Sequence, residues 1–254
     1  MTPLAWIEEI GHFTYFALRT LAALPSALLR PRETARIVYR VLIEALPLAV
    51  IAGIAIGLVL WMHIRSVLLR TAGSQSVEYL PTALSLAVLL EFAPIGAGLI
   101  VAGRMGASLG AELGAMRLTE QIDALEMLGL SALRELIAPR VLACVLALPL
   151  LTVLVASFAL SSAFVTEMAA GSLTALQYDQ KTWSETRIQD IIPAILKTTV
   201  FGFSIGVAGC YFGMKAEGGT EGVGRSATRG VEIATLLVLA VNVILVRIIQ
   251  WLVP

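Results

Sequence analysis

The chain has 254 residues and no formal net charge, and 58% of its residues are hydrophobic while only 14% are charged. Its mean hydropathy is +0.87. Soluble domains contain about half apolar and about a quarter charged residues, so this composition excludes an ordinary soluble domain and indicates an integral membrane protein. The 18 basic residues are balanced by 18 acidic ones, and nucleic acid is not an expected partner because its binding needs a basic excess.

The first 40 residues predict an amphipathic helix that lies in the membrane interface. Apolar residues recur there at three- and four-residue spacing and are interrupted by charged ones, namely at Ile7, Ile10, Phe13, Ala17, Leu21, Leu24 and Leu28. The arginine-rich run RPRETARIVYR follows at 30–40. Contact with anionic lipid headgroups is the simplest interpretation of these arginines, and a specific ligand is the alternative. Residues 1–40 therefore form an interfacial segment that precedes a membrane-spanning unit, 41–254.

Five stretches supply the roughly 20 consecutive apolar residues that a helix needs to cross a bilayer core. They run over residues 42–62, 80–103, 141–165, 191–214 and 231–253. None has the alternation of apolar and polar residues that a transmembrane β-strand requires, and a backbone inside lipid otherwise permits only helices. The sequence predicts an all-α membrane protein with five transmembrane helices.

The distribution of lysine and arginine predicts the orientation of these spans. With the amino terminus in the cytoplasm, most of the 18 basic residues fall in cytoplasmic segments, as the positive-inside rule requires. The carboxyl terminus is then outside. Trp61 and Trp251 fall at the outer ends of their spans, where indole rings are expected to anchor at the headgroup level.

Small residues mark faces where helices can approach closely. They recur every four residues in three spans or their extensions: Gly53 and Gly57; Ala102, Gly106, Gly110 and Gly114; and Gly202 and Gly206. Packing within one chain and packing between two copies of the chain are both consistent with this spacing.

Glu91 stands near the middle of the second span. A charged carboxylate there costs about 2.5–3.5 kcal/mol on insertion scales, so Glu91 is expected to face protein or water. Pro94 removes a backbone donor and can bend the helix, which favours a local cavity. We interpret the pair as part of a substrate cavity or gate; a protonated Glu91 with a structural hydrogen bond is the alternative. Lys197 and Arg247 lie nearer span ends, where long side chains are expected to reach the interface.

The connection between the second and third spans, 102–140, predicts a short ordered helix. Within TEQIDALEMLG, Thr119 is expected to cap the helix and Gly129 to end it. The apolar face of this helix consists of Leu118, Ile122, Leu125 and Leu128. The polar face consists of Glu120, Gln121, Asp123 and Glu126. A cytoplasmic protein is the expected partner, because an acidic face disfavours the alternative of an anionic membrane surface.

Several separate motifs carry a family resemblance. They are EFAP at 91–94, LIVAGRMGASLGAELGAMRLTEQIDALEMLG at 99–129, APRVLA at 138–143, LPLLTVL at 148–154 and EGVGRSATRGV at 221–231. In this order and with five spans, the chain resembles the MlaE (YrbE-like) permease family of MCE-type lipid ABC transporters over roughly 35–250. The resemblance implies a homodimeric permease in the bacterial inner membrane that moves phospholipid or another hydrophobic lipid.

The resemblance also implies partners and site residues. The expected partners are a cytoplasmic ABC ATPase dimer that binds ATP and Mg, a periplasmic MCE-domain protein, in the form of an oligomer, and in some systems a STAS-domain subunit; this chain itself would hold no cofactor or metal and catalyse no reaction. The family's coupling helix falls on Glu120, Gln121, Ile122, Asp123, Ala124, Leu125, Glu126 and Met127. Its lipid cavity falls on Glu91, Phe92, Ala93 and Pro94, with Glu91 as an unpaired acid.

The match departs from the family in two places. The family commonly has arginine before the cavity glutamate and leucine after it, whereas this chain has Leu90 and Phe92. The other departure is the region 171–190, which the resemblance assigns to contact with the periplasmic partner.

Other functions find weaker support. The sequence at 106–110 matches GxSxG and that at 222–227 matches GxGxxA, but neither follows a β-strand, so hydrolysis and dinucleotide binding are disfavoured. An ion-coupled secondary transporter with Glu91 as its proton site is the main alternative, although no internal repeat is detected. A membrane scaffold is a third, for which Glu91 would be dispensable.

Overall fold

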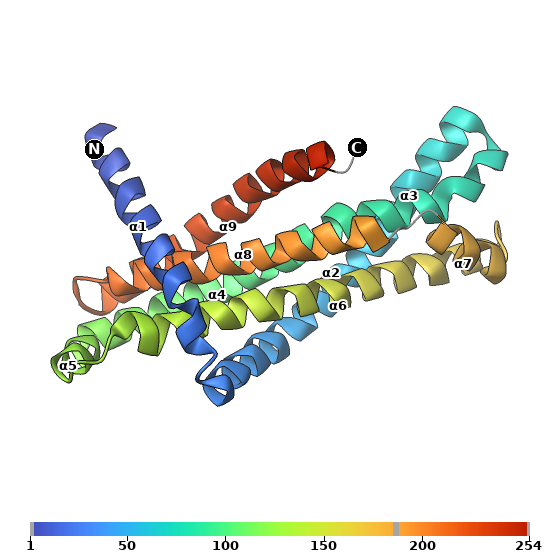
Figure 1. Cartoon of the computed structure of the whole chain (residues 1–254). Coiled ribbons are helices and arrows are strands. Elements are labelled where there is room, and N and C mark those ends of the chain that lie inside the picture. Colours follow the sequence, from blue (N-terminus) through green and yellow to red (C-terminus); the bar gives the residue numbers. More distant parts are fainter. Residues whose placement is uncertain (1–2, 185–187, 253–254) are drawn as a thin grey trace.

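A computed structural model describes residues 3–184 and 188–252, and all the regular structure in these ranges is helical (Figure 1). In chain order the elements are α1 (Pro3–Ala27), α2 (Pro31–Ala72), the 3-10 helix η1 (Ser74–Tyr79), α3 (Leu80–Ala87), the π-helical turn η2 (Val88–Phe92), α4 (Ala93–Leu118), α5 (Gln121–Met127), the π-helical turn η3 (Leu133–Ile137), α6 (Ala138–Ala170), α7 (Ala175–Ser184), α8 (Ile188–Met214) and α9 (Gly219–Leu252).

Within the residues that the structure describes, five helical stretches are long and apolar enough to cross a membrane, which confirms the predicted number. They are Pro31–Thr71, Gln75–Leu118, Leu133–Ala170, Ile191–Met214 and Gly219–Trp251. Four of them begin well before the predicted apolar stretch or continue well beyond it. The reason is that hydropathy marks only the part of a helix that suits lipid, whereas the polar turns beside it remain helical.

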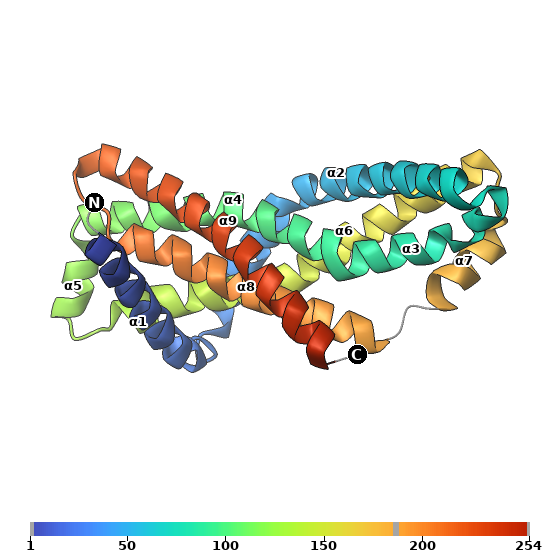
Figure 2. The same ribbon diagram turned by 90° about the horizontal axis from the view of Figure 1, so that it is seen from above.

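The long helices lie roughly side by side and define two ends of the molecule (Figures 1 and 2). One, which we call the α5 end, holds α5 and the first turns of α9, and the first turns of α2 lie towards it. The opposite α7 end holds α7 and η1. Helix α1 crosses the bundle near the α5 end and packs against α6 and α8. That the α5 end faces the cytoplasm stays a prediction from the positive-inside rule.

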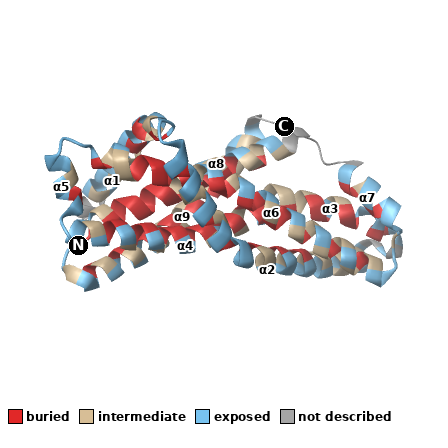
Figure 3. Ribbon diagram, turned by 90° about the horizontal axis from the view of Figure 1, so that it is seen from below, coloured by how far each residue is buried: buried red, intermediate tan, exposed pale blue. Residues whose placement is uncertain are grey.

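The core lies along α4, α6 and α8, where buried residues are concentrated (Figure 3). In the most apolar part of the third span 56% of the residues are buried, against 28% in the first span and 17% in the last. Helices α2 and α9 therefore flank the core and leave apolar side chains uncovered, as a chain surrounded by lipid or by a second subunit would.

Both π-helical turns stand directly before an Ala-Pro pair. Pro94 follows η2 and Pro139 follows η3. Proline donates no backbone hydrogen bond and clashes with the carbonyl four residues earlier. The wider turn accommodates this, because the amide of Ala93 donates to Val88 O and that of Ala138 to Leu133 O, five residues back. The expected distortion at Pro94 therefore takes the form of a π turn that includes Glu91.

Trp61 uses its indole N–H within the chain, and its place at the headgroup level stays a prediction. It is partly buried and donates a hydrogen bond to Glu167 Oε2 at 2.8 Å. Glu167 is fully buried, and its second oxygen has no partner among the described residues. Tyr178 of α7 lies close by, and burial, reinforced by the charge of Glu167, raises the pKa of its hydroxyl. This buried group links α2, α6 and α7.

The small residues serve packing within the chain, which decides between the two interpretations that their spacing left open. A Cβ atom built on Gly110 of α4 would lie 2.9 Å from backbone atoms of Ser226 and Ala227 on α9. Close approaches also join α2 and α8 to α6, through Gly53, Gly57, Gly202 and Gly206.

The contact between α4 and α9 can be tested with two glycines of the same helix. Gly110→Ala is expected to destabilise the chain by about 1–3 kcal/mol, because the added methyl group meets backbone that cannot rotate away. Gly103→Ala is the control, since nothing lies within 4 Å of its Cβ position, and its better helix propensity should leave the chain as stable or slightly more stable. Thermal unfolding in detergent measures both. Equal melting temperatures for the two variants would contradict this packing.

Candidate functional site: a buried ion pair and an exposed terminal helix

Three spans bring a carboxylate, an ammonium and an amide together inside the bundle. Glu91 of η2 accepts from Lys197 of α8, with 3.0 Å between Oε1 and Nζ. Asn242 of α9 donates its side-chain amide to Glu91 Oε2 at 3.2 Å. Both carboxylate oxygens are therefore engaged. We call these three residues the polar cluster.

The two charges of the polar cluster are unequally buried. The side chain of Lys197 is 2% exposed, whereas that of Glu91 is 36% exposed. An ammonium in an apolar interior needs a partner, because desolvation without compensation costs several kcal/mol. Glu91 neutralises Lys197 and at the same time presents one edge at the surface of the chain.

Two expectations about these residues were wrong. Lys197 was expected to reach the interface from a span end, but its side chain turns into the bundle to meet Glu91. Glu91 was expected to be an unpaired acid, but it has two partners. Hydropathy indicates how deep a residue lies in the membrane but not which residue it contacts on another helix. The sequence therefore could not pair Glu91 with Lys197.

The remaining predicted cavity residues divide between surface and core. Phe92 is 45% exposed, whereas Ala93 and Pro94 are buried. Asn242 was missed by the sequence analysis. The available signal was an isolated amide in the apolar run VLAVNVILV, since polar groups in membrane helices are expected to hydrogen-bond across helices.

A small apolar pocket begins at the same π turn as the polar cluster. Its volume is about 210 Å³, and its walls come from η2, α6, α7 and α8. Leu89 contributes from the same π turn as Glu91, and Ala194 and Ile195 contribute from the turn of α8 that precedes Lys197. None of the three residues of the polar cluster lines this pocket.

Helix α5 forms at the predicted place, with one difference at its start. Thr119 does not cap it; its hydroxyl donates to Ala115 O and closes the end of α4. Glu120, in the left-handed conformation with φ 56°, makes the turn into α5 instead. Gly129, with φ 78°, follows the helix as predicted, and its amide donates to Glu126 O.

Helix α5 is anchored on one side and exposed on the other. Ile122 is fully buried, and Asp123 forms an ion pair with Arg117 of α4. Met127 and the following Leu128 are 88% and 76% exposed. Large apolar side chains that are exposed at the tip of an anchored helix are typical of a protein contact.

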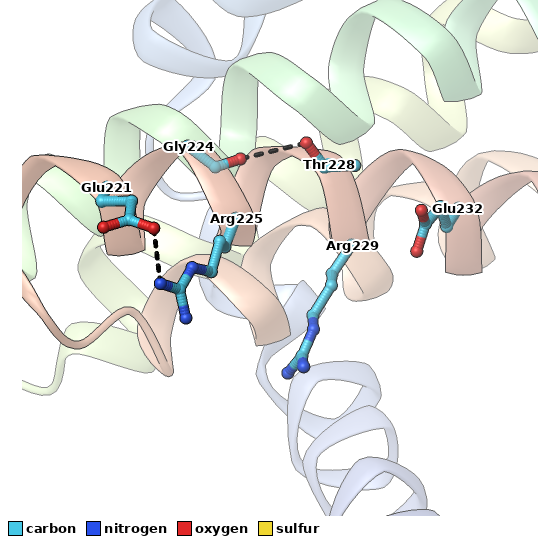
Figure 4. A pocket seen from close by; sticks show the side chains of 6 residues that line it. All are labelled: Glu221, Gly224, Arg225, Thr228, Arg229 and Glu232. Carbon is cyan, nitrogen blue, oxygen red and sulfur yellow. Dashed lines mark hydrogen bonds and ion pairs between the residues drawn. The ribbon is translucent and has the colours of Figure 1, made fainter.

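A second exposed surface at the α5 end belongs to the start of α9. Figure 4 shows Glu221, Arg225, Thr228, Arg229 and Glu232 along this helix, with Arg225 bound to Glu221 at 2.6 Å. The GxGxxA match lies in this helix and the GxSxG match in α4. Neither match follows a strand, so neither forms the turn that its chemistry requires.

Comparison with known proteins identifies relatives over most of the chain. The Permease MlaE family model matches residues 34–248. A probable ABC transporter permease protein of Rickettsia typhi is 30% identical over 246 residues, which cover 95% of this chain and 92% of the relative. The intermembrane phospholipid transport system permease protein MlaE of Haemophilus influenzae is 29% identical over 81% of this chain and 78% of its own length.

A plant relative is also similar. The chloroplastic protein TRIGALACTOSYLDIACYLGLYCEROL 1 of Arabidopsis thaliana is 38% identical over 148 residues, or 58% of this chain and 42% of the relative. The family match extends over α5 and over all three residues of the polar cluster. With five apolar spans in the order that the sequence predicted, the chain belongs to the MlaE permease family.

Proposed function

We propose that this chain is the membrane permease of an ABC-type lipid transport system in a bacterial inner membrane. It would pass phospholipid, or a related hydrophobic molecule, between the membrane and a periplasmic MCE-domain protein. The observation that carries the proposal is the family match over 34–248, together with a relative named for intermembrane phospholipid transport. ATP and Mg would be bound by a separate ATPase. The chain would use the movement of that ATPase to transport lipid and would catalyse no reaction itself.

The polar cluster and the apolar pocket that begins at Leu89 supply the two kinds of surface that an amphipathic lipid needs. Glu91 is partly exposed and could contact a polar headgroup, while the pocket lined by Leu89 could receive part of an acyl chain. Because Lys197 and Asn242 hold Glu91 from two different spans, a movement of α8 or α9 would change how far the carboxylate is presented to the lipid.

Helix α5 would receive the movement from the ATPase. Ile122 and the ion pair between Asp123 and Arg117 fasten α5 to the end of α4, so a push on Met127 and Leu128 would be transmitted to α4. Helix α4 continues through η2 to Glu91. Closure of an ATPase dimer would in this way switch the bundle between two packings and alter the lipid path.

A second copy of the chain would complete the transporter. The uncovered apolar side chains of α9, among them Leu236, Leu239 and Val243, would lie against lipid or a partner subunit. The amino terminus and α5 would be in the cytoplasm, and the carboxyl terminus and the segment around α7 outside, where the MCE-domain protein would bind. A STAS-domain subunit would join on the cytoplasmic side in some systems.

Ion-coupled transport remains the competing function, with Glu91 as the proton site. Its carboxylate is compensated by an ammonium and an amide. A proton on Glu91 would therefore leave the buried Lys197 without its partner, which makes the site a poor carrier of a single proton.

Reconstitution separates the two functions. In proteoliposomes with the chain, its ABC ATPase and a fluorescent phospholipid, we expect lipid movement that requires ATP hydrolysis and is unchanged when an ionophore removes the proton gradient. Proteoliposomes with the chain alone are the control and should move no lipid with or without a gradient. Gradient-driven movement by the chain alone would overturn the proposal in favour of secondary transport.

The coupling role of α5 has its own test. Met127→Ser with Leu128→Ser should weaken binding of the ATPase at least about ten-fold, since two exposed apolar side chains are each worth about 1.5–3 kcal/mol when an interface buries them. Co-purification from membranes measures the binding. Leu29→Ser with Ile51→Ser is the control: these side chains are 84% and 67% exposed on other surfaces, and ATPase binding should persist. Undiminished binding by the α5 variant would show that the ATPase docks elsewhere.

A further inference from the structure

A small polar pocket lies on the bundle between α2, α4 and α6, near the α5 end and away from the polar cluster. Its volume is about 180 Å³, and among its walls are three arginines, Arg36, Arg40 and Arg140. A single water molecule needs only about 10–15 Å³ of such space, so the pocket has room for a group of several atoms.

The charges in this pocket do not balance. Arg140 has a side chain 9% exposed and donates to Glu112 Oε1 at 2.8 Å and to Leu136 O at 2.8 Å. Glu33, the second acid in the wall, lies 3.8 Å from Arg30. Arg36 and Arg40 form no ion pair or hydrogen bond with any residue that the structure describes. The wall therefore holds three arginines against two acids, and the guanidinium groups of Arg36 and Arg40 have no bonded partner among the described residues beside that of Arg140, which is fixed in place.

The ends of three apolar stretches of the sequence indicate that the pocket lies at the depth of the lipid phosphates. Arg40 lies two residues before the apolar stretch 42–62, Arg140 directly before 141–165, and Met105 two residues after 80–103. Three spans therefore reach the boundary between apolar core and headgroup at the same pocket. This holds whichever side of the membrane the α5 end faces.

The walls are mixed in a way that suits a lipid. Ile37, Met105 and Leu109 give one part of the pocket an apolar lining, and the arginines give the other part donors with a planar fork that fits phosphate oxygens. A soluble anion would use only the arginines, whereas the phosphate of a membrane lipid also brings glycerol and acyl carbons to the apolar wall.

We propose that Arg36, Arg40 and Arg140 form a binding site for the phosphate headgroup of an anionic phospholipid in the leaflet at the α5 end. The site is separate from the transport path and concerns binding alone, so it does not rest on the proposed function. It also goes beyond general attraction of a basic segment to the membrane surface, because the ligand is held in a defined pocket with one buried arginine at its base.

Native mass spectrometry of the purified full chain tests the site, with phosphatidylglycerol and phosphatidylcholine as equal competitors. Arg36→Gln and Arg40→Gln should each lower bound phosphatidylglycerol about ten-fold or more, the effect of losing a charge-assisted hydrogen bond. The control is Arg32→Gln. Arg32 is exposed one turn earlier on the same helix but is not part of the pocket wall, and loss of one surface charge should reduce binding only about five-fold.

Several results would overturn the proposal. Equal losses for all three variants would indicate general surface attraction. Displacement of phosphatidylglycerol by an equal concentration of inorganic phosphate would assign the pocket to a soluble anion. Variants that keep their phosphatidylglycerol but lose the co-purifying ATPase would assign the two arginines to a protein contact. Unchanged melting temperatures confirm that each variant is folded.

Discussion

Lys197 is an ammonium group with almost no exposed surface inside an apolar helix bundle, and it requires compensation by groups from other helices. Glu91 of the second span meets this requirement for Lys197 of the fourth span, and Asn242 of the fifth span donates to the second oxygen of Glu91. The need to neutralise Lys197 therefore holds the second and fourth spans together, and the bond from Asn242 adds the fifth span. Removal of a single partner would leave a buried charge or amide unsatisfied, so these helices are expected to move together or to exchange partners together.

Helix α4 connects this interaction to the α5 end of the molecule. Its glycine face lies against the backbone of α9, its first turns follow the π turn with Glu91, and its last turns hold α5 through Ile122 and Arg117. Close backbone packing makes α4 and α9 a stiff pair, because there are few side chains between them to absorb a shift. A force applied at Met127 would therefore reach Glu91 through one continuous element.

Much of this organisation could be predicted from the sequence. The five spans follow from uninterrupted apolar stretches, and α5 follows from the alternation of Ile122 and Leu125 with acidic residues before Gly129. Both depend on local patterns of one segment. The glycine repeats predicted close packing but not the partner helix, since a small residue fits another helix of the same chain as well as a second copy.

What the sequence could not provide were contacts between distant segments. The pairing of Glu91 with Lys197 joins residues 106 positions apart, and that of Glu91 with Asn242 joins residues 151 positions apart. The periodicity of apolar residues along one helix carries no information about either pairing. Thr119 was misassigned for a related reason: the end of one helix and the start of the next compete for the same hydroxyl, and a carbonyl of α4 takes it.

The proposed transport path depends most on the Glu91–Lys197 pair, which must act on the lipid and not serve only as a structural contact. The most direct measurement is ATP-driven phospholipid transport in proteoliposomes by the triple variant Glu91→Leu, Lys197→Met and Asn242→Leu, which removes the whole polar cluster and leaves no amide without a partner. Replacement of both members of a buried ion pair by apolar residues is often neutral or stabilising, so the variant should keep its fold and its ATPase. We expect lipid transport by this stable variant to fall at least about ten-fold, the scale of one charge-assisted contact to a headgroup. Transport at the wild-type rate would contradict this expectation and show that the Glu91–Lys197 pair serves only in helix packing.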